Sequence, residues 1–177
     1  MTHEEEGALP EEIMWEGRFI TAKRRGRWEY VGRARGIHAA VILAVDDGHV
    51  LLVDQYRVPL GKRCIELPAG LVGDDEEGED SAVAAARELE EETGYRPGRI
   101  ENKGNFYSSP GMVSESFTLF SAHDLEKVGN GGGVDSEDII VHRVPIASLS
   151  AHVETWRTQG YAIDVKLLLL LGAQMLA

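Results

Sequence analysis

The stretch "ELEEETGY", residues 88–95, places four carboxylates within five positions. Residues three and four apart share one face of a helix, so Glu88, Glu91 and Glu92 are expected to project together and Glu90 to point away. Like charges at this spacing repel one another, and a hard divalent cation would remove the repulsion, because it takes carboxylate oxygens as ligands. The pattern therefore indicates a metal-binding helix face. A Glu-rich helix that is merely solvated is the alternative.

The flanking residues predict where this helix begins and ends. Asp80 or Ser81 is a suitable N-cap, an Ala-rich body follows, and Gly94 is a typical stop signal. An apolar stripe that includes Val83 and Leu89 is expected to pack the helix against a sheet.

The rest of the chain reads as strands followed by two closing helices. Strands are expected at residues 38–45, 50–58, 63–70, 98–111, 114–122 and 137–145, and helices at 146–160 and 163–176. The N-terminal stretch has aromatic and β-branched residues around a turn at Arg25 and Gly26, typical of a hairpin or small sheet. The order predicts an α/β (α+β) chain in two parts, a small N-terminal sheet over residues 1–37 and a main domain over residues 38–177.

Composition excludes some classes of function. The net charge of −12 argues against nucleic-acid binding, which depends on neutralising phosphates with Lys and Arg. The chain has a single cysteine, so no intrachain disulfide can form and a cytoplasmic location is the default expectation. The longest apolar run, after Lys166, is too short to span a membrane, and the acidic N-terminus does not resemble a signal peptide.

A longer pattern surrounds the carboxylate helix. Gly73, Glu79, Arg87, Glu88 and Gly94 satisfy the spacing G-x5-E-x7-R-E-U-x-E-E-x-G-U, where U is bulky and apolar, apart from a tyrosine in the last position. The stretch resembles the Nudix box of hydrolases that cleave nucleoside diphosphates linked to another moiety. The resemblance implies a Nudix fold, with a mixed β-sheet sandwiched between helices and a small N-terminal antiparallel sheet, and a requirement for Mg²⁺, which Mn²⁺ could replace.

The first glycine of the box has two candidates. In the family branch that acts on ADP-ribose this glycine follows Pro-Ala, which places it at Gly70 in "ELPAG" rather than at Gly73. We favour Gly70, with a three-residue insertion after it. The same alignment implies that the backbone carbonyl of Ala69 is a metal ligand beside Glu88 and Glu92, and that Glu91 holds a second ion or a bridging water.

Substrate-side residues follow from the same resemblance. Pro110 lies sixteen residues beyond Gly94, as in the ADP-ribose branch, although a Pro-Gly pair alone reads as a turn. Phe19 and Trp28 correspond to aromatic residues that sandwich adenine, though Trp28 could equally be hairpin packing. The remaining candidates are Glu29 for the adenine amino group, Arg33 for a phosphate or the base, Arg57 for the diphosphate or terminal ribose, and Met112 and Glu115 as further substrate contacts.

The glycine-rich segment "GNGGG", residues 129–133, predicts a flexible loop. Hydrolysis needs a base that takes a proton from water, and a mobile loop could bring one to the substrate. By resemblance Glu137 contacts a metal or the water, Asp135 is the alternative base, and Glu91 is a further catalytic candidate. Plain disorder is the other interpretation of such a loop.

These expectations combine into a homodimeric, magnesium-dependent hydrolase that converts ADP-ribose to AMP and ribose 5-phosphate. The resemblance implies that the N-terminal segment crosses to the partner chain and helps to build its adenine site. The same loop also resembles that of GDP-mannose hydrolases, so another nucleotide sugar is the leading alternative. A non-catalytic nucleotide-sensing domain is an alternative of another class, disfavoured because Glu88, Glu91 and Glu92 are all present.

Overall fold

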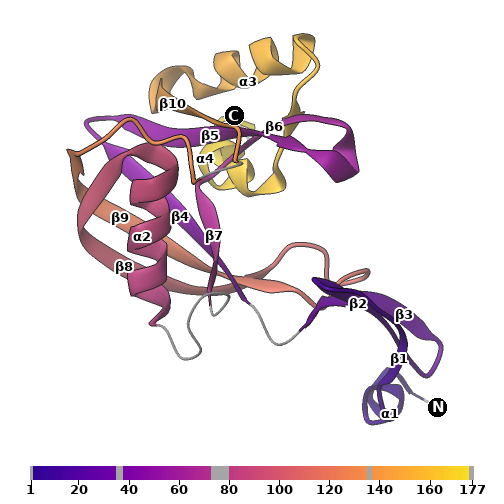
Figure 1. The fold of residues 1–177 in the computed structure, drawn as a ribbon. Helices are drawn as coiled ribbons and strands as arrows, with labels where there is room; N and C mark the ends of the chain where they lie inside the picture. The colour runs from indigo at the N-terminus through magenta and orange to yellow at the C-terminus, as the bar shows by residue number, and fades with distance from the viewer. Residues whose placement is uncertain (1, 35–37, 73–79, 135–136, 176–177) are drawn as a thin grey trace.

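The computed structural model describes residues 2–34, 38–72, 80–134 and 137–175. It consists of a main body built on an eight-stranded sheet, from which a three-stranded sheet at the N-terminus projects as an arm (Figure 1). The predicted boundary at residue 37 falls in a segment outside the described residues, so the division into two domains stays a prediction.

The arm is an antiparallel sheet preceded by one short helix. Its elements are α1 (His3–Gly7), β1 (Glu12–Glu16), β2 (Ile20–Arg25) and β3 (Trp28–Arg33). The turn between β2 and β3 lies where the sequence predicts it, and Gly26 adopts a positive φ of 58° there, which a residue with a side chain rarely does. The predicted small N-terminal sheet is therefore confirmed.

The large sheet is mixed. Its strands are β4 (His38–Asp46), β5 (His49–Arg57), β6 (Lys62–Glu66), β7 (Ala69–Val72), β8 (Tyr95–Tyr107), β9 (Ser116–Lys127), β10 (Ile139–Pro145) and β11 (Ala162–Ile163). They follow the order β11-β6-β5-β4-β9-β8, with β10 paired to β5 and β7 to β4. The pairs β4–β9 and β11–β6 are parallel and the other pairs are antiparallel.

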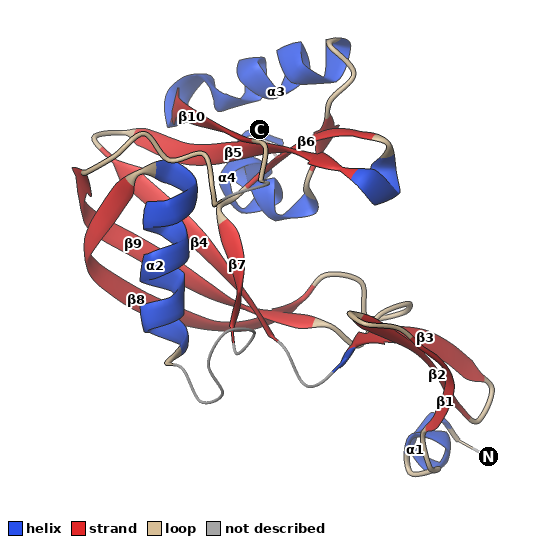
Figure 2. Ribbon diagram, viewed as in Figure 1, coloured by secondary structure: helices blue, strands red, loops and turns tan. Residues whose placement is uncertain are grey.

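Helices cover both faces of this sheet (Figure 2). Helix α2 (Ser81–Thr93) lies on one face, and α3 (Leu149–Thr158) and α4 (Leu168–Met175) lie on the other. Adjacent residues of β5 serve the two cores, because side chains alternate along a strand: Leu51 packs in the α2 core and Leu52 in the α3 core. The predicted sandwich of helices around a mixed sheet is confirmed.

The caps of α2 are those expected. The side chain of Asp80 accepts a hydrogen bond from the amide of Ala82, and Gly94 ends the helix with a φ of 75°. The apolar stripe differs from the prediction, since Ala84, Ala85 and Leu89 are buried while Val83 is 60% exposed. Val83 lies seven residues, or two turns, before Glu90 and therefore shares its solvent face.

Short 3₁₀ turns at Val58–Leu60, Ile146–Ser148 and Val165–Leu167 connect the larger elements. Among the helices of the described residues, none is both long and apolar enough to cross a membrane.

Candidate active site

A cavity of about 650 Å³ gathers eight of the residues that the sequence predicts to be catalytic, substrate-binding or metal-binding. These are Arg33, Arg57, Ala69, Glu88, Glu91, Glu92, Glu115 and Glu137. They come from β3, β5, β7, α2 and the segments before β9 and β10, so only the folded chain brings them together.

Glu92 is the most deeply placed of the carboxylates. Only 5% of it is exposed, and its Oε2 accepts a hydrogen bond of 3.0 Å from the amide of Ala69. Burial, with a smaller contribution from the charges of Glu88 and Glu137, raises the pKa of Glu92 to about 8, although the hydrogen bond from the Ala69 amide opposes the rise. Its charged form is therefore unfavourable until a cation comes close.

The amide of Ala69 is directed toward this carboxylate rather than into the ladder with β4. The amide of Ile42 donates to the carbonyl of Pro68, so Ile42 and Pro68 form a hydrogen-bonded pair of the β4–β7 ladder. Such pairs alternate with non-bonded ones along an antiparallel ladder, which makes Val41 and Ala69 a non-bonded pair. The ladder with β4 therefore does not use the Ala69 carbonyl, whose role as a metal ligand stays a prediction.

Gly70 lies directly against the side chain of Glu88. A Cβ atom built on Gly70 would lie 2.0 Å from Cδ of Glu88, far inside any permitted contact. Close approach of a backbone to a functional carboxylate is a reason for a glycine at this position. This packing supports Gly70 as the structural first glycine of the box, whereas Gly73 and Glu79 lie outside the described residues.

Glu88, Glu91 and Glu92 of α2 all line the cavity, but their carboxylates do not form one tight cluster. Nη1 of Arg87 lies 3.2 Å from Glu88 and 3.4 Å from Glu91. Among the described residues, no group of three acidic, His or Cys side chains is arranged tightly enough to hold a metal ion as it stands. Like charges repel one another, and the guanidinium of Arg87 offsets that repulsion between Glu88 and Glu91.

The donor set nevertheless fits a hard divalent cation. Three carboxylates and a backbone carbonyl outside its ladder offer only oxygen ligands, which Mg²⁺ and Mn²⁺ prefer. Glu90 does not take part: it points away and forms two hydrogen bonds with Arg96, which lower the pKa of Glu90. The sequence predicted both the shared face and the exclusion of Glu90.

The glycine-rich segment is docked onto the C-terminus of α2. The amides of Gly132 and Gly133 donate to the carbonyls of Glu92 and Glu91, at 2.8 and 3.1 Å. A Cβ atom on Gly131 would lie 2.4 Å from the backbone of Thr93, so the glycines permit this approach. Glycines of residues 129–133 therefore serve close packing against α2, and the flexibility expected of this loop stays a prediction.

Glu137 follows this docked segment and lines the cavity. Its Oε2 accepts a hydrogen bond of 3.2 Å from the amide of Val134, which folds the carboxylate back toward the loop. The alternative base, Asp135, lies outside the described residues.

Two of the predicted substrate residues contact each other. Nε of Arg33 donates to Glu115 at 2.6 Å, which ties β3 to the segment before β9. Arg57 makes a bidentate contact with Glu66, at 2.6 and 2.9 Å, and Glu66 is buried. Sequence reasoning missed Glu66; a carboxylate inside the apolar run "CIELPAG" was the available signal, because an acidic side chain is rarely buried without a partner.

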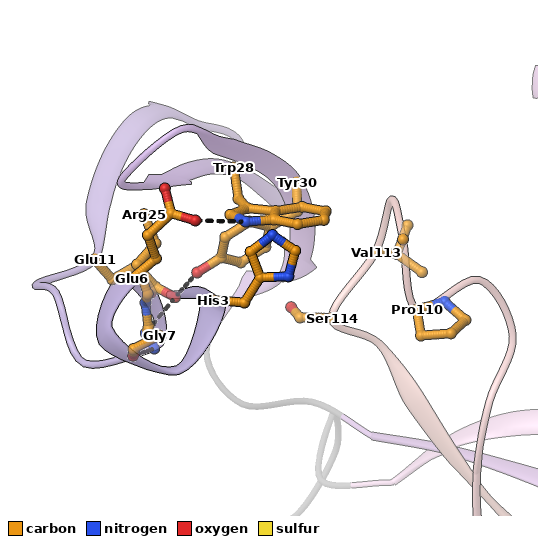
Figure 3. Close-up of a pocket in the computed structure, with 11 residues that line it drawn as sticks. His3, Glu6, Gly7, Glu11, Arg25, Trp28, Tyr30, Pro110, Val113 and Ser114 are labelled. Atoms are coloured by element: carbon orange, nitrogen blue, oxygen red, sulfur yellow. Dashed lines mark hydrogen bonds and ion pairs between the residues drawn. The ribbon is translucent and has the colours of Figure 1, made fainter. Parts of the chain in front are cut away.

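Trp28 lies in a second cavity of about 440 Å³ at the arm. Figure 3 shows Trp28 and Tyr30 facing Pro110 and Val113 across this space, and the indole of Trp28 donates to Glu6 of α1 at 3.3 Å. Pro110 belongs to a turn in which the amide of Met112 donates to Ser109. The contribution of α1 was not anticipated, since five residues are too few to give a periodic signal.

The other three substrate candidates line neither cavity. Phe19 and Met112 are 51% and 63% exposed, and Glu29 is exposed on β3. Their roles stay predictions.

Comparison with known proteins identifies the family. The model of the NUDIX domain matches residues 34–162. A methanol dehydrogenase activator from Bacillus methanolicus is 42% identical over 101 residues, and an ADP-ribose pyrophosphatase from Bacillus subtilis is 36% identical over 101 residues. Each of these matches covers 57% of this chain and 53% of the relative, so the chain spans about half the length of both.

Two further matches cover more of the chain. A GDP-mannose pyrophosphatase from Cronobacter sakazakii is 38% identical over 147 residues, covering 77% of this chain and 72% of the relative. The crystal structure of an ADP compounds hydrolase superposes with a TM-score of 0.65 at 23% identity, over 82% of this chain and 81% of that one, and shows the same fold. The family match includes β4 to β10 and the whole carboxylate helix, and the chain belongs to the Nudix domain family.

Proposed function

We propose that the chain is a divalent-metal-dependent hydrolase of nucleoside diphosphate sugars, with ADP-ribose as the substrate that gives AMP and ribose 5-phosphate. The observation that carries the proposal is the composition of the larger cavity, where the carboxylates of α2 and Glu137 stand together with Arg33 and Arg57. A diphosphate needs cations to neutralise it, and hydrolysis needs a base beside the attacked phosphorus.

The residues divide the chemistry among them. Glu88, Glu91, Glu92 and the Ala69 carbonyl would hold Mg²⁺, or Mn²⁺ in its place, and a bound cation there would polarise the phosphate and lower the pKa of a water. Glu137 accepts the proton of the attacking water while the new O–P bond forms and the bridging P–O bond breaks.

The arginines supply positive charge for the substrate diphosphate, which the carboxylates alone would repel. Arg33 and Arg57 line the same cavity as Glu88 and Glu137, and each is oriented by a carboxylate, Glu115 and Glu66 respectively. A guanidinium held in this way donates to phosphate oxygens with little loss of side-chain freedom. The net charge of the chain gives no reason to propose a nucleic-acid substrate. We also propose a cytoplasmic location.

One product assay ranks the substrates. With Mg²⁺ and equal concentrations of each substrate in separate reactions, we expect AMP release from ADP-ribose to exceed GMP release from GDP-mannose, both measured by ion-exchange chromatography. GDP-mannose is the second candidate, because the relative named for it matches over 77% of this chain. Faster GMP release would reverse the ranking. Absence of both products, with nucleotide binding retained, would instead support a sensing domain.

The geometry of the arm bears on the proposed homodimer. Ile20 pairs with Arg33 and Arg25 with Trp28, so Phe19 and Trp28 lie at opposite ends of the β2–β3 hairpin. Six strand steps, each of about 3.3 Å, separate them by about 20 Å. A base sandwiched between two rings needs them about 7 Å apart. Both aromatic residues can therefore stack on one base only if they come from two chains, which supports a dimer with exchanged arms.

Mixed dimers test the exchange. Trp28→Ala should lower kcat/KM about tenfold, as expected for one lost stacking contact. When Trp28→Ala and Glu92→Gln chains are coexpressed with different tags, half of the dimers are hybrids, and an exchanged arm gives each hybrid one complete site. We expect the mixture to recover about a quarter of the parent activity.

Hybrids purified through both tags provide the control for that experiment. If Trp28 serves its own chain, no hybrid contains a complete site, and hybrids no more active than the Trp28→Ala protein would contradict delivery of Trp28 to the partner site.

A further inference from the structure

An arginine outside the box connects three separate segments of the chain. Arg63 on β6 donates from Nε to Asp54 Oδ1 at 2.5 Å and from Nη2 to the Asp54 carbonyl at 2.9 Å. It also donates from Nη1 to Asp138 Oδ2 at 2.6 Å and from Nη2 to the Asp138 carbonyl at 3.0 Å. The whole guanidinium fork is thus engaged, by β5 on one side and by the residue just before β10 on the other.

The sheet register explains why this side chain reaches both partners. Arg63 lies opposite Tyr56 on β5, and Ile139 on the other flank of β5 lies opposite Gln55. One step further along that antiparallel register brings Asp138 opposite Tyr56 as well. Arg63 and Asp138 therefore flank the same residue of the central strand, about 10 Å apart in the sheet, and their side chains lie on one face.

The two carboxylates that Arg63 contacts differ strongly in exposure. The side chain of Asp54 is 1% exposed, while that of Asp138 is 76% exposed. A buried carboxylate without its arginine would be costly, so Asp54 holds the guanidinium in place. The guanidinium that meets the exposed Asp138 therefore already has a fixed orientation. The Arg63–Asp138 pair thus lacks the side-chain freedom that makes most surface ion pairs weak.

Asp138 is the residue directly after Glu137. On its other side, the segment that leads to Glu137 is held on α2 through the amides of Gly132 and Gly133. Glu137 therefore lies between two anchors, one on the helix of the metal-binding carboxylates and one on Arg63. Asp138 does not line the larger cavity, whereas Glu137 does.

We propose that Arg63 is a positioning residue for Glu137, acting through Asp138 and held by Asp54. The inference rests on the proposed function, in which Glu137 receives the proton of the attacking water. Proton transfer requires the carboxylate within hydrogen-bond reach of that water, and a displacement of about 1 Å can cost 10²-fold in rate. Release of the Asp138 anchor should therefore lower the rate of the chemical step rather than the affinity for substrate.

Asp138→Ala tests the anchor without disturbing the core, because this side chain is exposed. We expect kcat to fall about tenfold and KM to change less than about twofold, since Asp138 does not contact the substrate. Arg63→Lys, which keeps a positive charge beside Asp54 but lacks the fork, should lose kcat to the same extent. Glu154→Ala is the matched control: this exposed carboxylate also pairs with an arginine at 2.6 Å, on α3, and its loss should leave kcat unchanged.

Two measurements separate positioning from a general structural role. Amide hydrogen exchange of the peptide that covers residues 129–140 should be about fivefold faster in Asp138→Ala, with unchanged exchange in α2. In the double variant with Glu137→Gln, the Asp138→Ala change should add no further loss, because the group that it positions is already inactive.

The outcomes distinguish the two proposals. Unchanged exchange in Asp138→Ala, or losses that multiply in the double variant, would overturn the positioning role of Arg63. Parent-like turnover of Glu137→Gln would overturn the assignment of Glu137 as the base, and exchange would still report the anchor because it does not depend on turnover.

Discussion

Replacing Glu92 with glutamine should lower nucleotide release by about 10³-fold or more while leaving the protein folded. Glutamine keeps the shape of the side chain and an oxygen that can accept the Ala69 amide, but it removes the charge that a cation requires. Because Glu92 is buried, the neutral side chain also removes a charge that the fold accommodates poorly. Thermal unfolding should therefore occur at a temperature no lower than that of the parent.

The control for this variant lies on the same helix. Glu90→Gln changes a carboxylate that points to solvent and pairs with Arg96 outside the cavity, so its turnover should stay within about twofold of the parent. Steady-state rates at saturating Mg²⁺ and calorimetric titration of Mg²⁺ measure both variants. Comparable turnover of Glu92→Gln and the parent would remove Glu92 from the metal-binding set.

Gly70→Ala is expected to have the second largest effect, although it adds one methyl group. The new Cβ atom would lie 2.0 Å from Cδ of Glu88 if nothing moved, so the Glu88 side chain must swing away from its place in the cavity. Gly70 has no positive φ, and its ladder with Ala40 can tolerate alanine. We expect Mg²⁺ affinity and kcat/KM to fall about 10²-fold, with thermal stability nearly unchanged.

Gly172→Ala is the matched control, since a Cβ atom there meets no atom within 4 Å. It should bind Mg²⁺ and turn over substrate as the parent does. If Gly70→Ala retained parent-like Mg²⁺ affinity, Glu88 would not be a ligand, and the case for Gly70 as the first glycine of the box would lose its physical basis.

Much of the fold could be predicted because its signals are local. The caps of α2, the apolar strands and the closing helices each depend on neighbouring residues, and most were located from the sequence. The single strand expected at residues 63–70 is wrong, because the chain forms β6 and β7 there, which pair with β5 and β4. The last helix begins at Leu168 rather than at residue 163. The predicted apolar stripe of α2 was displaced, because the face that a helix buries depends on the sheet it meets. Val83 had no such partner and remains in solvent.

The glycine-rich loop shows the limit of predicting local structure from composition. Glycine favours flexible chains, but it also permits backbones to approach closely. The same glycine-rich sequence is therefore compatible with a flexible segment and with a closely packed one. Only the neighbouring helix shows that Gly131, Gly132 and Gly133 are packed against the backbone of α2.

By itself the sequence determined the carboxylate helix, its shared face of Glu88, Glu91 and Glu92, and the family to which the chain belongs, because these depend on residues within a few turns of one another. The tertiary structure decided the contacts that orient the site: Glu92 with Ala69 across 23 residues, Arg63 with Asp138 across 75, and Arg33 with Glu115 across 82. Such pairs follow from strand register and from the order of strands in the sheet, and a chain folded in any other order would separate the same residues.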